Sequence, residues 1–259
     1  PGANPALPLM EKVREHRQQN AQGIANHSAC PANTHTSLYV SDIQAKHLRR
    51  ALWGGLKNGM LEQADSTFLI PLYWKHQEAD SIVEKATLLT VTDYQTVLEQ
   101  LPKTYNFYNN NLPILTASIL SPLASAGNTY YHYYLVDSTY VDNEKHYLLH
   151  FRSKNSFYAT FNGEMTIDSA TYALRSISVT LPEHSPINYL RQLTIKQTFS
   201  TNNQIEDEKL SMLLDFAIKS DTSHIFPTLM LQRANWIDTK QTKQNITHIT
   251  PAQPIPAEE

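Results

Sequence analysis

The fold is decided by the segment Ile187-Asn-Tyr-Leu-Arg-Gln-Leu-Thr-Ile-Lys-Gln-Thr-Phe199. Large apolar side chains recur at its odd positions, namely Ile187, Tyr189, Leu193, Ile195 and Phe199. The even positions are polar, with Leu190 as the apolar exception. Successive side chains of a strand point to opposite faces of the sheet, so a period of two indicates a half-buried strand. The segment therefore predicts a strand with one apolar face and one solvated face.

The next segment repeats this pattern in the even register, at Leu210, Met212, Leu214, Phe216 and Ile218. Similar alternating runs, separated by turn residues and without helical spacing, extend over Thr129–Ile218. Short strands joined by tight turns are typical of antiparallel pairing. We expect a mainly β fold with a minor helical part, in which residues 129–218 form an antiparallel meander with one broad apolar face.

The first hairpin of this meander is predicted to turn at Asp142-Asn143, because both residue types tolerate the positive φ of a two-residue loop. A loop of that length places Tyr134 opposite Phe151 and Val136 opposite Leu149.

A second hairpin is predicted to turn at Ser169-Ala170. That turn sets three cross-strand pairs: Met165 with Leu174, Ile167 with Tyr172, and Glu164 with Arg175. The apolar residues change from even to odd positions beyond this point. A bulge near Arg175-Ser176 restores a single apolar face and curves the sheet.

Composition limits the class of protein. Of the 259 residues, 41% are hydrophobic and 17% are charged, and 14 are Tyr. The net charge of −3 argues against a nucleic-acid partner, because no basic stripe is present to release counterions. The single cysteine, Cys30, excludes an intramolecular disulfide and a thiolate metal site. No apolar run approaches the ~20 residues of a membrane helix, so we expect a chain that does not itself span the membrane.

The rest of the chain is expected to contribute few further elements. We predict one domain over residues 1–249 and a proline-rich tail or linker over residues 250–259. Within the domain, the patterns predict a helix over Leu7–Asn20, a loop over Ala21–Thr36, a strand at the start of Ser37–Trp53, an edge or entrance strand over Thr67–Trp74 interrupted by Pro71, and a helix over Asp93–Leu101.

Several motifs resemble those of a Gram-negative envelope family. They are Tyr105-Asn-Phe-Tyr-Asn-Asn, Leu120-Ser-Pro-Leu-Ala, Tyr130-Tyr-His-Tyr-Tyr-Leu-Val-Asp-Ser and Phe161-Asn-Gly-Glu-Met-Thr-Ile-Asp-Ser-Ala-Thr-Tyr-Ala-Leu. The family is a domain of unknown function in outer-membrane proteins, usually found after a carboxypeptidase-regulatory-like domain and before an integral β-barrel. The resemblance covers roughly residues 66–200, and Ser37–Gly59 departs from it.

The last of these motifs is also similar to a hairpin of the outer-membrane lipoprotein-carrier superfamily. That similarity implies a curved antiparallel sheet in the form of an unclosed half-barrel, with short helices as a lid. Together the two resemblances imply a location on the periplasmic side of the outer membrane.

A single sheet with one apolar face must cover that face with helices, a second layer or a ligand. We therefore expect the concave face to bind an apolar ligand, either a lipid or a lipidated partner. The candidate ligand-binding residues are Phe161, Met165, Tyr189, Leu193, Ile195, Phe199, Met212, Leu214 and Phe216. The alternative is that the same side chains form an ordinary packed core.

Catalytic and metal chemistry have little support in the sequence. His146 and His150 share a strand face, but at ~3.3 Å per residue they stand about 13 Å apart, too far to ligate one ion. No zinc-protease, nucleophile-elbow or phosphate-loop motif is present. We expect no enzyme, no cofactor and no metal site, and a dispersed group drawn from Asp168, Glu164 and His184 is the enzymatic alternative.

Two other binding functions stay open. An exposed sheet edge can dock on an outer-membrane barrel or another protein partner by adding a strand. A row of aromatic side chains can stack on sugar rings, and Tyr130, Tyr131, Tyr133 and Tyr134, together with Trp53, Trp74 and Trp236, supply candidates. Exposed rings favour carbohydrate, whereas rings buried against Phe151 and Leu149 favour a structural role.

Overall fold

A computed structural model of the protein describes residues 4–26, 33–41, 70–78, 81–86, 98–141, 143–187, 189–215, 218–220, 223–225 and 228–236. Several predictions fall outside these residues. They concern Cys30, Trp53, Phe216, most of the helix expected over Asp93–Leu101, and the tail over residues 250–259.

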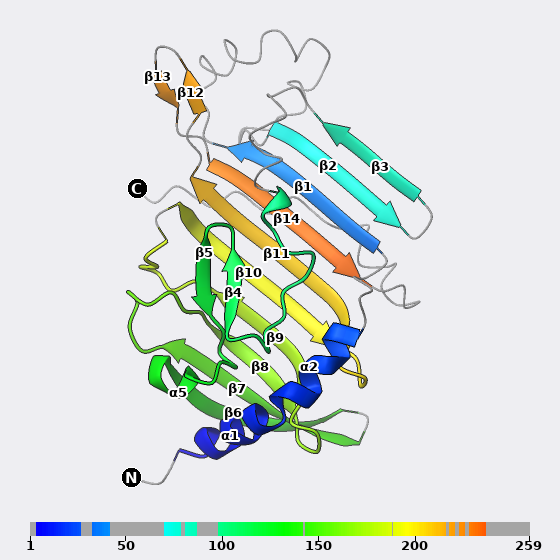
Figure 1. Ribbon diagram of the computed structural model, residues 1–259, viewed down its shortest axis with the longest axis vertical. Helices are drawn as coiled ribbons and strands as arrows, with labels where there is room; N and C mark the ends of the chain where they lie inside the picture. The colour runs from blue at the N-terminus through cyan, green and yellow to red at the C-terminus, as the bar shows by residue number, and fades with distance from the viewer. Residues whose placement is uncertain are drawn as a thin grey trace.

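Ten strands of the described part form one antiparallel sheet, which Figure 1 shows face on. The strands are β1 (Asn33–Ser41), β2 (Ile70–Glu78), β3 (Ser81–Ala86), β6 (Tyr131–Val141), β7 (Glu144–Ser153), β8 (Asn162–Asp168), β9 (Leu174–Thr180), β10 (Leu190–Phe199), β11 (Ile205–Asp215) and β14 (Thr228–Trp236). Their order is β3-β2-β1-β14-β11-β10-β9-β8-β7-β6. The sheet does not close, because β3 and β6 lie at its two ends. The predicted mainly β, curved and unclosed antiparallel fold is confirmed.

The meander predicted over residues 129–218 is confirmed from residue 131 to residue 215, since β6 to β11 are consecutive neighbours in the sheet. Its two ends differ, because residues 129–130 belong to α5 and Ile218 belongs to the separate β12–β13 hairpin. Leu190, the apolar exception of β10, is buried like the apolar odd residues Leu193, Ile195 and Phe199 of that strand. The register shifts between Leu190 and Gln192, so Arg191 forms a bulge that turns Leu190 toward the apolar face.

The first hairpin has the predicted turn but a different register. Val141 pairs with Glu144, so the loop contains two residues, and Asn143 has the expected positive φ of 68°. A register shift between Leu135 and Asp137 then moves every later pair by one residue. The predicted pairs are therefore wrong: Tyr133, not Tyr134, lies opposite Phe151, and Leu135, not Val136, lies opposite Leu149.

The second hairpin has a longer turn than predicted. Ile167 pairs with Leu174 and Met165 with Ile177, so the predicted partners of these residues are wrong. The Asp168 carboxylate accepts hydrogen bonds from the Ala170 and Thr171 amides and holds the wider turn. The predicted bulge is confirmed, because the partners change from Ser176 to Leu174 and leave Arg175 as the extra residue.

The N-terminal helix is longer than predicted and has a break. α1 (Ala6–Glu15) is followed by its C-cap residue His16, and α2 (Arg17–Asn26) begins directly after it. The loop expected over Ala21–Thr36 is therefore wrong at both ends, because α2 and β1 extend into it. Helix propensity in a glutamine- and alanine-rich stretch outweighs the turn-forming residues there.

The strand containing Pro71 is not at the edge of the sheet. β2 lies between β3 and β1, which contradicts the edge prediction. Pro71 is instead the second residue of β2, at the entrance of the strand. It pairs with Tyr39 next to a register shift that leaves Leu72 of β2 as the extra residue, and such an irregularity accommodates a residue without an N–H.

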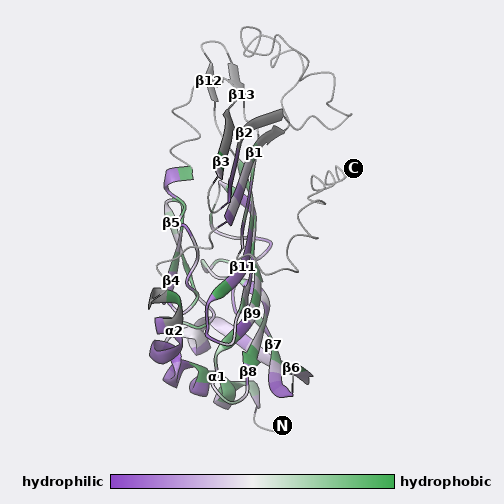
Figure 2. Cartoon of the chain, turned by 90° about the vertical axis from the view of Figure 1, so that its right-hand side faces the viewer, coloured by the Kyte–Doolittle hydropathy of each residue, from purple (hydrophilic) through white to green (hydrophobic). Residues whose placement is uncertain are grey.

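A second layer covers one face of the sheet near β6 to β11. It consists of α1, α2, the short helix α5 (Gly127–Tyr130) and the hairpin of β4 (Asn111–Ile114) with β5 (Ala117–Leu120). Figure 2 shows this layer on one side of the sheet when the sheet is viewed edge on. A further small hairpin, β12 (Ile218–Ser220) with β13 (Ser223–Ile225), lies at the far end of the molecule (Figure 1).

Candidate functional site

The predicted ligand-binding residues lie together on the covered face of the sheet. Seven of them are buried members of a single hydrophobic core: Phe161, Met165, Leu193, Ile195, Phe199, Met212 and Leu214. Tyr189 is partly buried and packs against this core. Phe216 lies outside the described residues. The sequence therefore identified a set of side chains that the fold brings together.

The layer over these residues is itself apolar. Residues 101–123, which we call the cover, contribute side chains to the same core: Leu101, Tyr105, Phe107, Tyr108, Leu112, Ile114, Ile119 and Leu123. The rings of Phe107 and Phe161 lie 6.2 Å apart, and the Leu174 amide donates a hydrogen bond to Tyr108 Oη. In this structure the cover fills the apolar face.

One end of the cover is held by buried tyrosines of β6. Tyr131 Oη donates to the Leu120 carbonyl, and Tyr133 Oη donates to the Pro122 carbonyl (2.6 Å). The Arg14 side chain of α1 donates to Tyr133 Oη (3.3 Å) and joins the helix to the same point. Burial raises the pKa of Tyr133 to about 12, against the opposing effect of Arg14. These contacts attach the cover and α1 to one edge of the sheet.

The other end of the cover is held by a buried polar cluster around Glu208, which is fully buried. Its Oε2 accepts hydrogen bonds from the Tyr105 amide (2.9 Å) and Gln197 Nε2 (2.6 Å). Its Oε1 accepts from Arg233 Nη2 (3.1 Å) and Asn235 Nδ2 (3.0 Å). All three side-chain donors come from the sheet. Strand pairing sets Gln197 and Asn235 directly opposite Glu208, and Arg233 lies two residues before Asn235 on β14.

The same three donors also bind the backbone of the cover. Arg233 Nη1 donates to the Pro102 carbonyl (2.6 Å), Asn235 Nδ2 to the Lys103 carbonyl (2.9 Å) and Gln197 Nε2 to the Tyr105 carbonyl (2.7 Å). We call Gln197, Glu208, Arg233 and Asn235 the latch. Sequence reasoning missed the latch. Its signal was a polar residue at an apolar-phase position, Gln197 in β10 and Glu208 in β11.

The tyrosines proposed as a carbohydrate platform do not form one open row. Tyr131 and Tyr133 are buried, and Tyr131 packs edge-on against Phe151 at 5.8 Å. Tyr134 is exposed, and Trp236 is buried on β14. The buried rings pack and hydrogen-bond as structural residues. The side chains of Trp53 and Trp74 lie outside the described residues.

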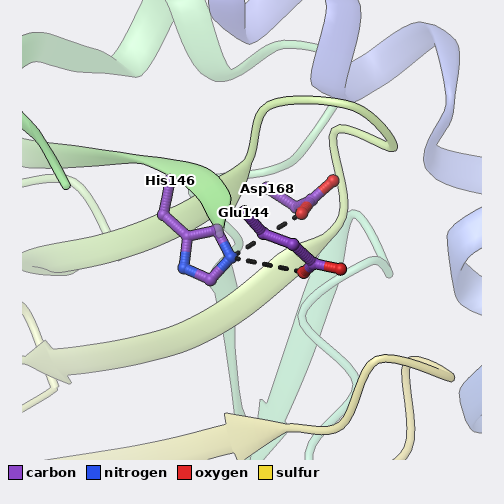
Figure 3. A group of neighbouring side chains, drawn as sticks. All are labelled: Glu144, His146 and Asp168. Carbon is purple, nitrogen blue, oxygen red and sulfur yellow. Dashed lines mark ion pairs between the residues drawn. The ribbon is translucent and has the colours of Figure 1, made fainter. Parts of the chain in front are cut away.

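One histidine and two carboxylates form a cluster on the neighbouring strands β7 and β8. His146 Nε2 is 3.7 Å from Asp168 Oδ2 and 3.8 Å from Glu144 Oε2 (Figure 3). Strand pairing places His146 directly opposite Asp168, and Glu144 is two residues before His146 on the same strand. The spacing of His146 and His150 excludes a shared ion, but cross-strand carboxylates supply other partners. His150 has its own partner, Glu164, at 3.4 Å.

Most of the exposed large apolar side chains of the sheet lie on its β6 edge, and Ile82 lies on β3 at the opposite end. Those on β6 are Tyr134, Val136, Tyr140 and Val141, and Tyr140 is 72% exposed. In the described part of the chain β6 has a neighbouring strand, β7, on one side only. No helix in the described residues is long and apolar enough to cross a membrane.

Comparison with solved structures gives weak similarities at very low sequence identity. A LolA-superfamily protein from Nitrosomonas europaea has 9% identity and a TM-score of 0.25, with 92% of this chain and 96% of that chain covered. MucB in complex with MucA(peri) has 6% identity and a TM-score of 0.28, with 88% and 93% covered. The MucA/MucB complex of Pseudomonas aeruginosa has 6% identity and a TM-score of 0.24, with 90% and 96% covered.

No curated protein matches the sequence. A family model does match, over residues 79–223, which include β6 to β11, the cover and the hairpin turn at Asp168. The chain belongs to the family of unknown function DUF5686.

Proposed function

We propose that this domain is a non-enzymatic binding module of the Gram-negative cell envelope, on the periplasmic side of the outer membrane. Its ligand is apolar, a lipid or a lipidated partner, and binds the sheet face that the cover occupies in this structure. Binding then requires the cover to lift from Phe161, Leu193, Met212 and their neighbours.

The observation that carries this proposal is the arrangement of polar and apolar contacts along the cover. Its central side chains are apolar and replaceable by any apolar surface of similar shape. Its start at Pro102–Tyr105 and its end at Leu120–Pro122 are held by directional hydrogen bonds. Between these ends apolar side chains pack against the core, and hydrogen bonds join Tyr108 Oη to the Leu174 amide and Thr116 Oγ1 to Tyr189 Oη. A segment held in this way can exchange its apolar contacts for those of a ligand. An acyl chain supplies those contacts.

The test weakens the latch rather than the apolar face. Leu193→Asp or Met212→Asp would place a carboxylate at a buried position and unfold the protein, so loss of binding there would not identify a site. Gln197→Met removes two hydrogen bonds from the latch, keeps a side chain of similar size and leaves the Arg233–Glu208 ion pair in place. Because it raises the population of the lifted state, it is expected to increase the affinity for dansyl-labelled undecanoic acid about tenfold.

Gln192→Met, at an exposed position of the same strand β10, is the matched control and should bind the probe like the unaltered protein. A second measurement needs no substitution: hydrogen exchange of residues 105–123 should accelerate when the probe is added, while β10 and β11 stay protected. Equal binding by both variants, or no change in exchange, would mean that the covered face is a permanent core.

Partner docking is the second candidate, and the exposed apolar residues of β6 favour it. An edge strand with Tyr140 and Val141 exposed can accept a strand from an outer-membrane protein. A photo-cross-linker at Tyr140 should capture an integral outer-membrane protein in cells, whereas one at exposed Glu183 should not. Identical products from both positions would contradict docking at this edge.

A further inference from the structure

We infer that Glu144, His146 and Asp168 form a binding site for a divalent transition-metal cation of the zinc class. The site lies outside the covered face and is independent of the proposed ligand. It joins β7 to the β8–β9 turn.

The three ligand atoms have the spacing that such an ion needs. One nitrogen and two carboxylate oxygens lie within 4.8 Å of one another. The two distances from His146 Nε2 are 3.7 Å and 3.8 Å. Ligands of a tetrahedral Zn²⁺, with bonds of about 2.0–2.2 Å, stand roughly 3.4 Å apart. A contraction of a few tenths of an ångström brings the two distances from His146 to this value. The two carboxylate oxygens, which lie within 4.8 Å of each other, approach by rotation of the exposed Glu144 side chain, and the fourth position is left to water.

The imidazole is buried and lacks a hydrogen-bond partner at the atom that faces the carboxylates. His146 is 8% exposed, and its Nε2 makes no hydrogen bond. Figure 3 shows this nitrogen directed between Glu144 and Asp168. A buried polar atom without a partner costs free energy, and a metal ion would satisfy it together with both carboxylates.

The Asp168 carboxylate is already fixed in place by its surroundings. Its Oδ1 accepts hydrogen bonds from the Ala170 amide (3.0 Å), the Thr171 amide (2.7 Å) and Thr171 Oγ1 (2.7 Å). Its Oδ2 faces His146, with Arg175 Nη2 at 3.5 Å. Hydrogen bonds to one carboxylate oxygen orient the other toward a metal, and such outer partners are common at metal sites. Arg175 is itself tied to the Ser200 carbonyl (2.8 Å), so it stays beside the site as a fixed positive charge.

The donor set selects the class of metal. One imidazole nitrogen with two carboxylate oxygens suits Zn²⁺ and its first-row neighbours. Ca²⁺ and Mg²⁺ prefer oxygen ligands throughout and leave an imidazole unused. Glu144 is largely exposed, which gives the ion a route from solvent.

The test is metal binding by the whole purified protein after chelation and dialysis. Titration with Zn²⁺ in a calorimeter should give one saturable site per chain, and Co²⁺ should give the visible absorption of a low-coordinate nitrogen–oxygen site. Glu144→Gln and His146→Gln should each weaken Zn²⁺ affinity at least tenfold. Glu144 is exposed, so its variant tests the site without a risk to folding. Asp168 is left unaltered because it holds the turn.

The matched control is His150→Gln, which removes a histidine from the same strand and from a single exposed carboxylate partner, Glu164. It should bind Zn²⁺ like the unaltered protein. The thermal midpoint should rise with Zn²⁺ in the unaltered and control chains and stay constant in His146→Gln. Absence of a saturable site, or equal affinity in His146→Gln and His150→Gln, would overturn the inference and leave His146 as an ion-pair partner of the two carboxylates.

Discussion

At the scale of single residues, the covered face depends on a buried carboxylate, Glu208, whose two oxygens both accept hydrogen bonds. Glu208 has four hydrogen-bond donors on its two oxygens, from β10, β14 and the cover. A buried carboxylate is costly to desolvate, and charge-assisted hydrogen bonds of this number offset that cost. The latch is therefore specific: it holds the cover at one position where apolar contacts alone would allow several.

Glu208→Gln should strongly destabilise the protein. The glutamine amide replaces one carboxylate oxygen, which now accepts two hydrogen bonds, by an NH2 group that can only donate. It also leaves the Arg233 guanidinium buried without its counter-charge. Breaking one member of such a pair costs about 3–5 kcal/mol of unfolding free energy. Urea denaturation followed by circular dichroism measures it.

Glu206→Gln, on the same strand but less buried, is the control and should change stability by less than about 0.5 kcal/mol. Equal effects of the two substitutions would show that the latch contributes no more than an ordinary surface carboxylate.

At the scale of elements, buried tyrosine hydroxyls connect strands to the layer above them. Tyr131 and Tyr133 of β6 bind the end of the cover, and Tyr108 of the cover binds the β9 backbone. Each hydroxyl must stay protonated to remain buried, because its ionised form loses solvation. Burial raises the pKa of all three tyrosines, and it brings those of Tyr108 and Tyr133 to about 12.

Stability should therefore fall steeply in alkaline solution. The folded-state pKa of each tyrosine lies above its unfolded value, so the stability it contributes is fully present below pH 10 and is lost as the pH rises toward 12. Urea midpoints measured from pH 8 to pH 11.5 should decline above pH 10, in step with tyrosinate absorbance.

Tyr133→Phe should flatten part of this decline, and Tyr140→Phe, at an exposed position, should not alter it. A decline of the same size in both variants would assign the alkaline loss to groups other than the buried tyrosines.

At the scale of the whole molecule, the first and last strands of the described chain, β1 and β14, pair within the sheet. β1 lies between β14 and β2, so the N-terminal strand joins the meander to the β2–β3 hairpin. Leu38 and Leu231 are direct partners across that junction, and both are fully buried. The sheet is therefore complete only after the chain has been almost entirely traversed, which gives long-range pairings a large part in its stability.

Leu38→Ala should destabilise the whole domain. Truncation of a fully buried leucine costs about 2–5 kcal/mol, through lost burial and the cavity that remains. Denaturant unfolding monitored by tryptophan fluorescence measures the effect.

Leu7→Ala, at an exposed position of α1, is the matched control and should have little effect. Hydrogen exchange in Leu38→Ala should rise in β14 and β2 together. A rise confined to β1 would show that the junction does not couple the two parts of the sheet.

The sequence by itself determined the strands, the meander and the apolar face. Alternation at Ile187–Phe199 and Leu210–Leu214 is a local property of the chain, and the side-chain period of a strand converts it directly into a face. The bulge near Arg175 was predictable for the same reason, since a change of phase must be absorbed within the strand. The helix boundaries and the interior position of the strand that contains Pro71 were not predictable from the sequence, because tertiary packing overrides local preference there.

Only the tertiary structure decided what covers that face and which polar groups meet. The latch joins Gln197, Glu208, Arg233 and Asn235 to the backbone at residues 102–105, and the residues of the proposed metal site come from two strands, β7 and β8. Such contacts depend on register, and one bulged residue moves every later partner, as Val136 does in the first hairpin. Register is set by the packing of both strands at once, so these sites exist only in the folded sheet.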